Sequence, residues 1–311
     1  MGILDDRVAL VTGAGAGIGR AHALALAVAG ARVVVNDIGV DLDGGGGSRA
    51  PADEVVAEIV RRGGQAVASF DSVAGYASAG AIVETALRAF GRLDIVINNA
   101  SVFRDGPFAT MTPEDFAADL TVHLGGTFNI CKHALPLMVA QGRGRIINTS
   151  SPVWHGASGL AAYAAAKAGI VGLSFDLAAE YWAHGVTVNV LLPGALTEHR
   201  QVQGRTWLGR LEAAGVARPS FDPSGPTALT PDHVPPLAVY LASDEAGDIS
   251  GMLFEAVGNT VGVYAHPAVV RRASKDAAAP PWTLDEVRRA TRDTLLTDRA
   301  RAPHLPERTP T

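Results

Sequence analysis

The chain has 311 residues, a formal net charge of -5 and a single cysteine, and 48% of its residues are hydrophobic against 18% charged. This length can bury a substantial core, and the acidic balance without a long basic run argues against nucleic acid or an anionic membrane as the main partner. The single cysteine, Cys131, excludes an internal disulfide and a metal site built on cysteines. No stretch is apolar over the roughly 18–20 residues that a membrane span needs, and the N-terminus lacks the basic region of a signal peptide, so we expect a cytoplasmic protein.

A glycine-rich turn separates the first predicted strand, residues 7–12, from an alanine- and leucine-rich helix that runs to about Ala29. Glycines let the backbone approach a ligand, and the free N–H groups and dipole of a helix N-terminus favour an anion. The pattern therefore predicts a site for a pyrophosphate, with a plain turn as the alternative. The residues that would form it are Gly13, Gly17, Ile18 and Gly19.

The second predicted strand, residues 31–36, ends in Asp37, 18 residues beyond Gly19. An acidic side chain at this place can accept hydrogen bonds from both ribose hydroxyls of a dinucleotide and repels a 2′-phosphate. Ala16 occupies the turn position where a competing basic side chain could lie. The pattern favours NAD over NADP; the alternative is that Asp37 only ends the strand.

Three later strand ends carry small or polar residues. Residues 38–50 form a glycine-rich insert, and the strand at 65–69 then leads to Asp71, Ser72 and Val73, where Asp71 and Val73 would flank an adenine and Ser72 would also contact the cofactor. A buried strand at 93–98 ends at Asn99 and Ala100, and a strand at 186–192 stops at Pro193 and Gly194. In a parallel sheet these carboxyl ends share one edge, which is where a dinucleotide crosses the sheet.

The regular alternation of strands and helices predicts an α/β fold: a doubly wound parallel sheet of seven strands with helices on both faces. We expect one dinucleotide-binding catalytic domain over residues 1–258, with a substrate flap at about 195–230 and a short helix near 206–214. A C-terminal extension, residues 259–311, loses regularity apart from a helix after the cap Thr283.

Tyr163 and Lys167 are four residues apart on a predicted helix, which places the phenol and the ammonium on one face. A free tyrosine has a pKa of about 10, and a cation within about 4–6 Å favours the phenolate. A serine from the preceding strand would hold a substrate oxygen against the phenol. Counting back thirteen residues from Tyr163 gives Ser150, whereas the alternation of side chains along the strand gives Ser151, which we prefer.

These motifs, in this order, resemble the classical short-chain dehydrogenase/reductase family over about residues 5–258. Within it the chain is most similar to the (3R)-hydroxyacyl-CoA dehydrogenase domain of peroxisomal multifunctional enzyme type 2 and its bacterial relatives, some of which resemble hydroxysteroid dehydrogenases. The resemblance implies hydride transfer between a nicotinamide and a secondary alcohol or ketone. It assigns the acid/base to Tyr163, the lowering of its pKa and the nicotinamide ribose to Lys167, and the substrate oxygen to Ser151.

Some positions depart from the family pattern. His123 stands where the family usually has asparagine, and the resemblance makes it a member of a proton relay through its main-chain carbonyl and a water; a structural role is the alternative. Ser101 replaces the usual glycine after Ala100, and Thr197 lies one residue early for a contact with the cofactor's carboxamide.

We therefore expect an NAD-dependent oxidoreductase acting on CH–OH groups, first on a 3-hydroxyacyl thioester and second on a steroid or polyketide-type ketone. Phe103, Trp154 and Trp207 would line an apolar substrate pocket. Partners would be the small-molecule substrate and further copies in a homodimer or homotetramer, with no metal, nucleic acid or membrane. Alternatives from other classes are a non-catalytic NAD-sensing protein and a structural partner subunit.

Overall fold

The computed structural model describes residues 2–40, 45–195, 198–216 and 229–296, and it divides into two compact units, Met1–Tyr264 and Ala265–Thr311. The first unit is built on one eight-stranded sheet in the order β3-β2-β1-β4-β5-β6-β7-β8. The strands are β1 Val8–Thr12, β2 Arg32–Asn36, β3 Ala66–Ser69, β4 Ile95–Asn98, β5 Gly144–Thr149, β6 Val186–Gly194, β7 Leu253–Val257 and β8 Thr260–Val263.

Seven of these strands pair in parallel, and β8 pairs antiparallel with β7. The chain order runs outwards from β1 to β3 and then returns to the other side of β1 with β4. This reversal opens a crevice at the carboxyl ends of β1 and β4, which is where open α/β sheets bind their ligands. The expected fold class is confirmed.

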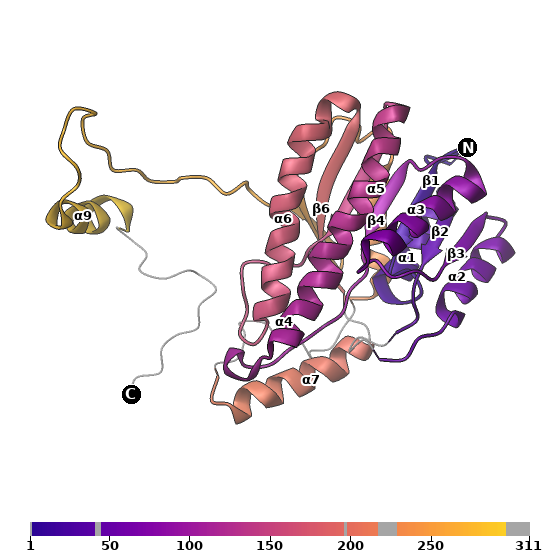
Figure 1. Ribbon diagram of the computed structural model, residues 1–311, viewed down its shortest axis with the longest axis horizontal. Helices are drawn as coiled ribbons and strands as arrows, with labels where there is room; N and C mark the ends of the chain where they lie inside the picture. The colour runs from indigo at the N-terminus through magenta and orange to yellow at the C-terminus, as the bar shows by residue number, and fades with distance from the viewer. Residues whose placement is uncertain (1, 41–44, 196–197, 217–228, 297–311) are drawn as a thin grey trace. The chain divides into compact units, whose positions relative to one another are not determined.

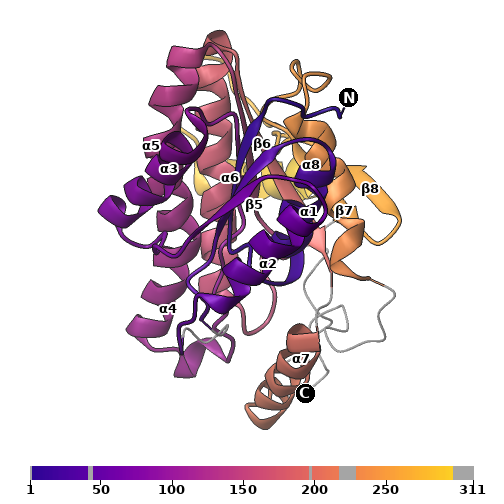
Figure 2. The same ribbon diagram turned by 90° about the vertical axis from the view of Figure 1, so that its right-hand side faces the viewer.

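Helices cover both faces of the sheet (Figures 1 and 2). One core cluster joins the sheet to α1 (Gly17–Val28), α2 (Ala50–Arg61) and α8 (Pro235–Ala242). The other joins it to α3 (Tyr76–Phe90), α5 (Gly126–Gln141) and α6 (Ala161–Tyr181). Strand β1 is buried along its whole length, with alternate residues in the two clusters, which explains why its sequence is apolar throughout.

Helices α4 (Pro113–Asp119) and α5 belong to one continuous helical segment. Thr112 and Asp115 form a capping box at its start. Between the two helices, the turn Leu120–Gly125 is a π-helix, η2, with His123 in its middle. Single π-turns inside α-helices often occur at functional sites.

Two elements differ from the expectation at this end of the domain. The sheet gains β8, because the chain turns back after Gly258 (φ +54°) and pairs Thr260–Val263 with β7. Strand β6 continues through Pro193 to Gly194, because Pro193 lies opposite Ala256 of β7 beyond the last residue that pairs with β5.

The flap helix is longer than expected: α7 spans Glu198–Ala213 and lies at the carboxyl-end edge of the sheet in both views (Figures 1 and 2). The rest of the expected flap, residues 217–228, and Thr197 with its carboxamide contact lie outside the described residues.

The second unit has a short helix, α9 (Leu284–Ala290), that begins at the expected cap Thr283, whose hydroxyl accepts from the Glu286 N–H. Lys275 forms an ion pair with Glu286 at 2.9 Å and lies over the ring of Trp282. Within the described parts of both units, no helix has the length and apolarity to cross a membrane.

Candidate active site

The glycine-rich turn at residues 13–19 lies where β1 and β4 end, and hydrogen bonds link these two strand ends. The Thr12 hydroxyl accepts the main-chain N–H groups of Asn99 and Ala100 at 3.0 Å each, and the Asn99 amide donates to the carbonyls of Thr12 and Gly13 at 3.1 Å. A Cβ at Gly19 would lie 2.0 Å from the Gly13 carbonyl oxygen. Gly13, at φ +61°, would bring a Cβ to 2.8 Å from Ala100 Cα. Glycine is therefore required at both positions, because side chains would push the turn off the strand ends.

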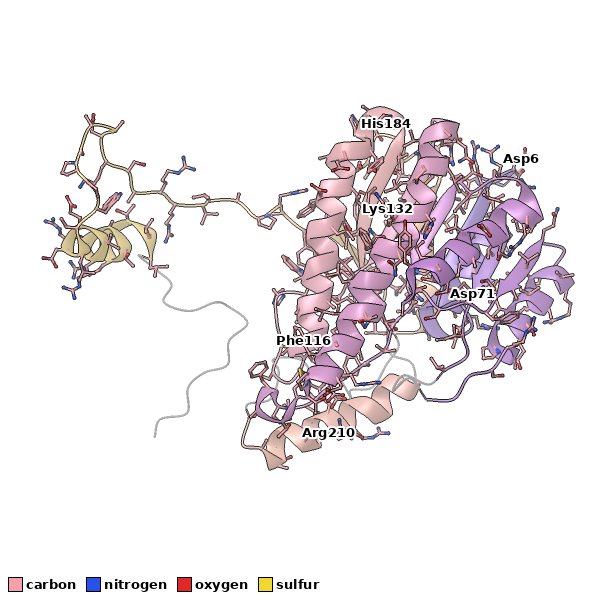
Figure 3. The ribbon with its side chains drawn as sticks, viewed as in Figure 1. Asp6, Asp71, Phe116, Lys132, His184 and Arg210 are labelled. Atoms are coloured by element: carbon pink, nitrogen blue, oxygen red, sulfur yellow. The ribbon has the colours of Figure 1, made fainter. Side chains whose placement is uncertain are left out.

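Asp37 points its carboxylate back at this turn. Its Oδ2 accepts the Gly15 N–H at 2.8 Å and its Oδ1 accepts the Gly39 N–H at 2.7 Å. These bonds fix the carboxylate beside the turn, and each oxygen keeps a second lone pair for a further donor. A side-chain hydrogen bond also links the end of β2 to the segment after β3, because the Asn36 amide donates to the Asp71 carbonyl at 2.9 Å. Figure 3 labels Asp71, and Ser72 follows it with its hydroxyl accepting the Ala74 N–H at 3.2 Å.

The last strand on this edge is β6. A Cβ at Gly194 would lie 2.6 Å from the Val257 side chain, so glycine is required for the close packing of β6 on β7. Together, the turn, Asp37 and the ends of β3, β4 and β6 form a row of backbone donors and small residues along one edge. This donor set fits a dinucleotide: main-chain N–H groups for phosphates, a carboxylate for ribose hydroxyls and small residues where a flat ring must approach the backbone.

Tyr163 and Lys167 lie on α6 as the four-residue spacing predicts. The ammonium is 5.4 Å from the centroid of the phenol ring, and both side chains are buried, with 6% and 2% of their surface exposed. Lys167 Nζ also donates to the Thr149 carbonyl at 2.9 Å, which ties the helix to the end of β5. The lysine is thus held beside the tyrosine by the fold itself.

The two candidate serines have different surroundings. The Ser150 hydroxyl donates to the main-chain carbonyl of Lys167 at 2.9 Å and is buried in the contact between β5 and α6. Ser151 begins the following turn, and its hydroxyl accepts the Val153 N–H at 3.4 Å, which leaves its proton for another acceptor. The geometry therefore favours Ser151 as the hydroxyl that meets a substrate and gives Ser150 a structural contact.

His123 lies beside the tyrosine. Its Nε2 is 2.7 Å from the Val102 carbonyl oxygen, and because a carbonyl can only accept, Nε2 carries the proton. Its main-chain carbonyl accepts the Thr127 hydroxyl at 2.7 Å. The structure thus brings His123 into the group, with its ring fixed by the segment that follows β4.

An apolar cluster surrounds the phenol. Leu160, Tyr163, Trp207 and Leu211 form its buried part, and Phe103 packs against it with its ring centroid 5.1 Å from that of Tyr163. Trp154 packs instead against a different cluster, formed by Val171, Val190, Leu192 and Leu253. Of the three aromatic residues expected to line a pocket, Phe103 and Trp207 therefore meet the tyrosine and Trp154 does not belong to that cluster.

The flap helix α7 is fastened over this cluster by two polar contacts. The Trp207 indole N–H donates to the Ser158 carbonyl at 3.1 Å, and Arg210 forms an ion pair with Asp105 at 2.9 Å. Burial raises the pKa of Asp105 above its usual value, and the Arg210 guanidinium offsets only part of this rise. Figure 3 labels Arg210 on α7 and Phe116 on α4, both at the same end of the domain, opposite His184.

Two buried titratable residues escaped the sequence reasoning. Asp119 has no exposed surface, and burial raises the pKa of its carboxyl to about 7 against the opposing effect of Arg104. His22 on α1 is also fully buried, and burial lowers its pKa to about 4. A polar residue on an otherwise apolar helix face was the available signal in each case, but such residues more often reach the surface.

The fold and this edge of the sheet define a class: dinucleotide-binding α/β oxidoreductases that pair a tyrosine with a lysine four residues later. The short chain dehydrogenase family model matches residues 7–207, and the chain belongs to this family. It is an oxidoreductase that acts on CH–OH groups, in a family that typically uses NAD(P).

Three known proteins show how far the similarity extends. Mouse peroxisomal multifunctional enzyme type 2 is 40% identical over 260 residues, which are 83% of this chain and 32% of that protein. Hydroxyacyl-CoA dehydrogenase ChsB1 of Mycobacterium tuberculosis is 35% identical over 300 residues, 93% of this chain and 89% of that one. The crystal structure of a short chain dehydrogenase from Mycobacterium avium matches with a TM-score of 0.76 and 40% identity, covering 94% of this chain and 96% of that chain. The chain thus spans about a third of the length of the mouse multifunctional enzyme and most of the length of the two mycobacterial proteins.

Proposed function

We propose that this protein is an NAD-dependent dehydrogenase that interconverts a secondary alcohol and a ketone, with a 3-hydroxyacyl thioester as substrate. The observation that carries the proposal is the pair on α6: a buried phenol with a buried ammonium 5.4 Å from its ring centroid, on the same domain edge as the glycine turn. The name of the Mycobacterium tuberculosis relative, a hydroxyacyl-CoA dehydrogenase, supports the thioester as the substrate class.

Each residue has a role that follows from its chemistry. Tyr163 gives a proton to the oxygen of a ketone, or takes one from an alcohol. Lys167 favours the phenolate, and moving a tyrosine pKa from about 10 to about 7 corresponds to about 4 kcal/mol, which is more than an exposed ion pair supplies. The bound dinucleotide, through its nicotinamide ring, supplies or accepts the hydride.

Ser151 orients the substrate oxygen with the proton that its turn leaves available. His123 enters as a relay member through its main-chain carbonyl, which in this structure accepts the Thr127 hydroxyl at 2.7 Å and the Gly126 N–H. Phe103 and Trp207 supply an apolar wall that excludes water from the phenol.

NAD, as opposed to NADP, is supported by Asp37. Its carboxylate is fixed beside the glycine turn by the N–H groups of Gly15 and Gly39, where a 2′-phosphate would meet a negative charge at short range. The residues that would hold the dinucleotide are Gly13, Gly17, Ile18, Gly19, Asp37, Asp71, Ser72, Asn99, Ala100, Tyr163, Lys167, Pro193 and Gly194.

A steroid or polyketide-type ketone is the second candidate substrate, because the aromatic wall of Phe103 and Trp207 would also fit a fused ring system. The proposed homodimer or homotetramer rests on the family resemblance, in which the two long helical segments at 112–140 and 160–184 pack across a subunit interface. A cytoplasmic location and the division into residues 1–258 and 259–311 remain proposals from the sequence.

The experiment that tests the proposal is a screen for NADH formation with the full-length protein. It would compare 3-hydroxyacyl-CoA esters in both configurations, hydroxysteroids and simple secondary alcohols, each with NAD and with NADP. We expect turnover with hydroxyacyl-CoA esters and NAD. Turnover of hydroxysteroids alone would select the second candidate, and binding of NAD without turnover of any alcohol or ketone would favour a sensing protein.

A further inference from the structure

A carboxyl group that the proposed chemistry does not use is buried one helical turn before His123. Asp119 is the last residue of α4, it has no exposed surface, and neither carboxylate oxygen has a partner in ordinary hydrogen-bond geometry among the described residues. The helix α4 and the π-turn η2 both pack against α6, which carries Tyr163 and Lys167. A charge on Asp119 would therefore lie across a helix contact from the proposed acid/base.

Residues 102–104 run along this helix, and Asp119 and His123 face opposite ends of the segment. His123 Nε2 donates to the Val102 carbonyl at 2.7 Å, and the main-chain N–H of Arg104 is the donor that faces the Asp119 carboxyl. Between these two attachments lies Phe103, whose ring meets the Tyr163 ring at 68° with centroids 5.1 Å apart. The His123 bond and the Asp119 carboxyl therefore lie at the two ends of the segment that supports one side of the phenol.

The charged groups around Asp119 come from each element packed against it. Arg104 from the 102–104 segment and Lys167 from α6 favour its ionised form, and Asp115 from α4 opposes it. Burial is the largest effect and raises the pKa of Asp119 to about 7. The carboxyl therefore carries its proton below about pH 7 and becomes an anion above it.

We propose that Asp119 is a positioning residue for Tyr163: its carboxyl, as an acceptor facing the Arg104 N–H, anchors the 102–104 segment to the helix, and its ionisation opposes the effect of Lys167 on the phenol. A nearby negative charge disfavours the phenolate, so ionised Asp119 makes Tyr163 harder to deprotonate. The consequence for turnover rests on the proposed function, whereas the effect on the phenol does not.

An ultraviolet titration of the phenol tests the electrostatic part without any substrate. The full-length wild type, Asp119→Asn and the control Glu114→Gln are each titrated against the same protein carrying Tyr163→Phe, so that the difference reports Tyr163 alone. Glu114 is an exposed acid on the same helix. We expect Asp119→Asn to lower the midpoint by roughly half a pH unit and Glu114→Gln to leave it unchanged. Equal midpoints for wild type and Asp119→Asn would overturn the proposal.

Steady-state kinetics with the alcohol found by the screen test the anchoring part. Asp119→Asn keeps the size and polarity of the side chain, and we expect it to retain most of kcat. The apparent pKa of Tyr163 in the pH profile of kcat should be lower than in the wild type. Asp119→Leu removes the polar group, and we expect kcat to fall about tenfold with KM for NAD unchanged.

Equal kcat for the Asn and Leu variants would reject the anchoring role. If Asp119→Leu does not fold, or if the screen finds no alcohol, the titration of Asp119→Asn still decides the proposal. The screen for NADH formation tests the proposed function, and the midpoints of the ultraviolet titration test this inference. The failure of one can therefore be distinguished from the failure of the other.

Discussion

The imidazole of His123 meets the phenol ring of Tyr163 at 90°, with ring centroids 5.2 Å apart. The imidazole is fixed in this position by its bond to the Val102 carbonyl, and the turn that carries it is a π-helix. A side chain that sequence reasoning assigned only through its main-chain carbonyl therefore also forms a wall of the site, edge to face with the proposed acid/base.

Tyr163→Phe should abolish turnover while leaving NAD affinity nearly intact. The substitution removes the proton donor and acceptor but keeps the ring that packs against Phe103 and His123. Stopped-flow or steady-state NADH formation, paired with fluorescence titration of NAD, measures the two properties separately. Retained oxidation of every accepted alcohol by this variant would reject the role given to Tyr163.

The two neighbouring serines offer a matched comparison. Ser151→Ala should lower kcat about a hundredfold, because it removes a donor aimed at the substrate oxygen, with little change in thermal stability. Ser150→Ala should instead cost about 1 kcal/mol of unfolding free energy, because it removes a buried hydrogen bond to the Lys167 carbonyl. Chemical denaturation and kinetics of both variants check this, and the reverse pattern would exchange the two assignments.

Asp37→Ala should shift the preference from NAD towards NADP by about tenfold or more in the ratio of kcat/KM values, because the carboxylate that repels a 2′-phosphate is gone. The loss of its bonds to the Gly15 and Gly39 N–H groups should also loosen the turn and raise KM for both cofactors. Asp37→Asn removes the charge and keeps one of the two acceptor atoms, so we expect it to loosen the turn less than alanine does. An unchanged selectivity in both variants would remove Asp37 from the account of cofactor choice.

Buried His22 should make the fold sensitive to mild acid. Burial lowers its pKa to about 4, whereas an unfolded histidine has a pKa of about 6.5. The unfolded state therefore binds a proton that the folded state refuses, so this contribution is complete above about pH 6.5 and is lost as the pH falls towards 4. The full loss is about 3 kcal/mol.

Urea denaturation of wild type and His22→Leu from pH 7 to pH 4 measures this effect. The raised pKa of Asp119 acts with the opposite sign over an overlapping range, so the difference between the two proteins isolates the histidine. We expect His22→Leu to flatten the acid side of the profile and to cost little at neutral pH, because neither ring nitrogen has a hydrogen-bond partner among the described residues. Parallel profiles for the two proteins would contradict this.

The fold and its main site were accessible from local patterns. The strand, glycine turn and helix at Gly13–Gly19 follow from the order of apolar, glycine and alanine residues, and the capping boxes at Thr112 and Thr283 follow from a three-residue spacing. Sequence reasoning missed β8, because the four residues Thr260–Val263 are too short for a period and become a strand only through pairing with β7.

The sequence by itself determined the features that depend on neighbours along the chain: the glycines of the turn, the acid at the end of β2, and the tyrosine and lysine one helical turn apart. Only the tertiary structure decided which serine hydroxyl donates to the Lys167 carbonyl. It also decided that Trp154 packs in a separate cluster and that Asp119 and His22 are buried. The reason is physical, because hydrogen-bond partners, burial and the resulting pKa values depend on groups that the fold brings together from distant parts of the chain.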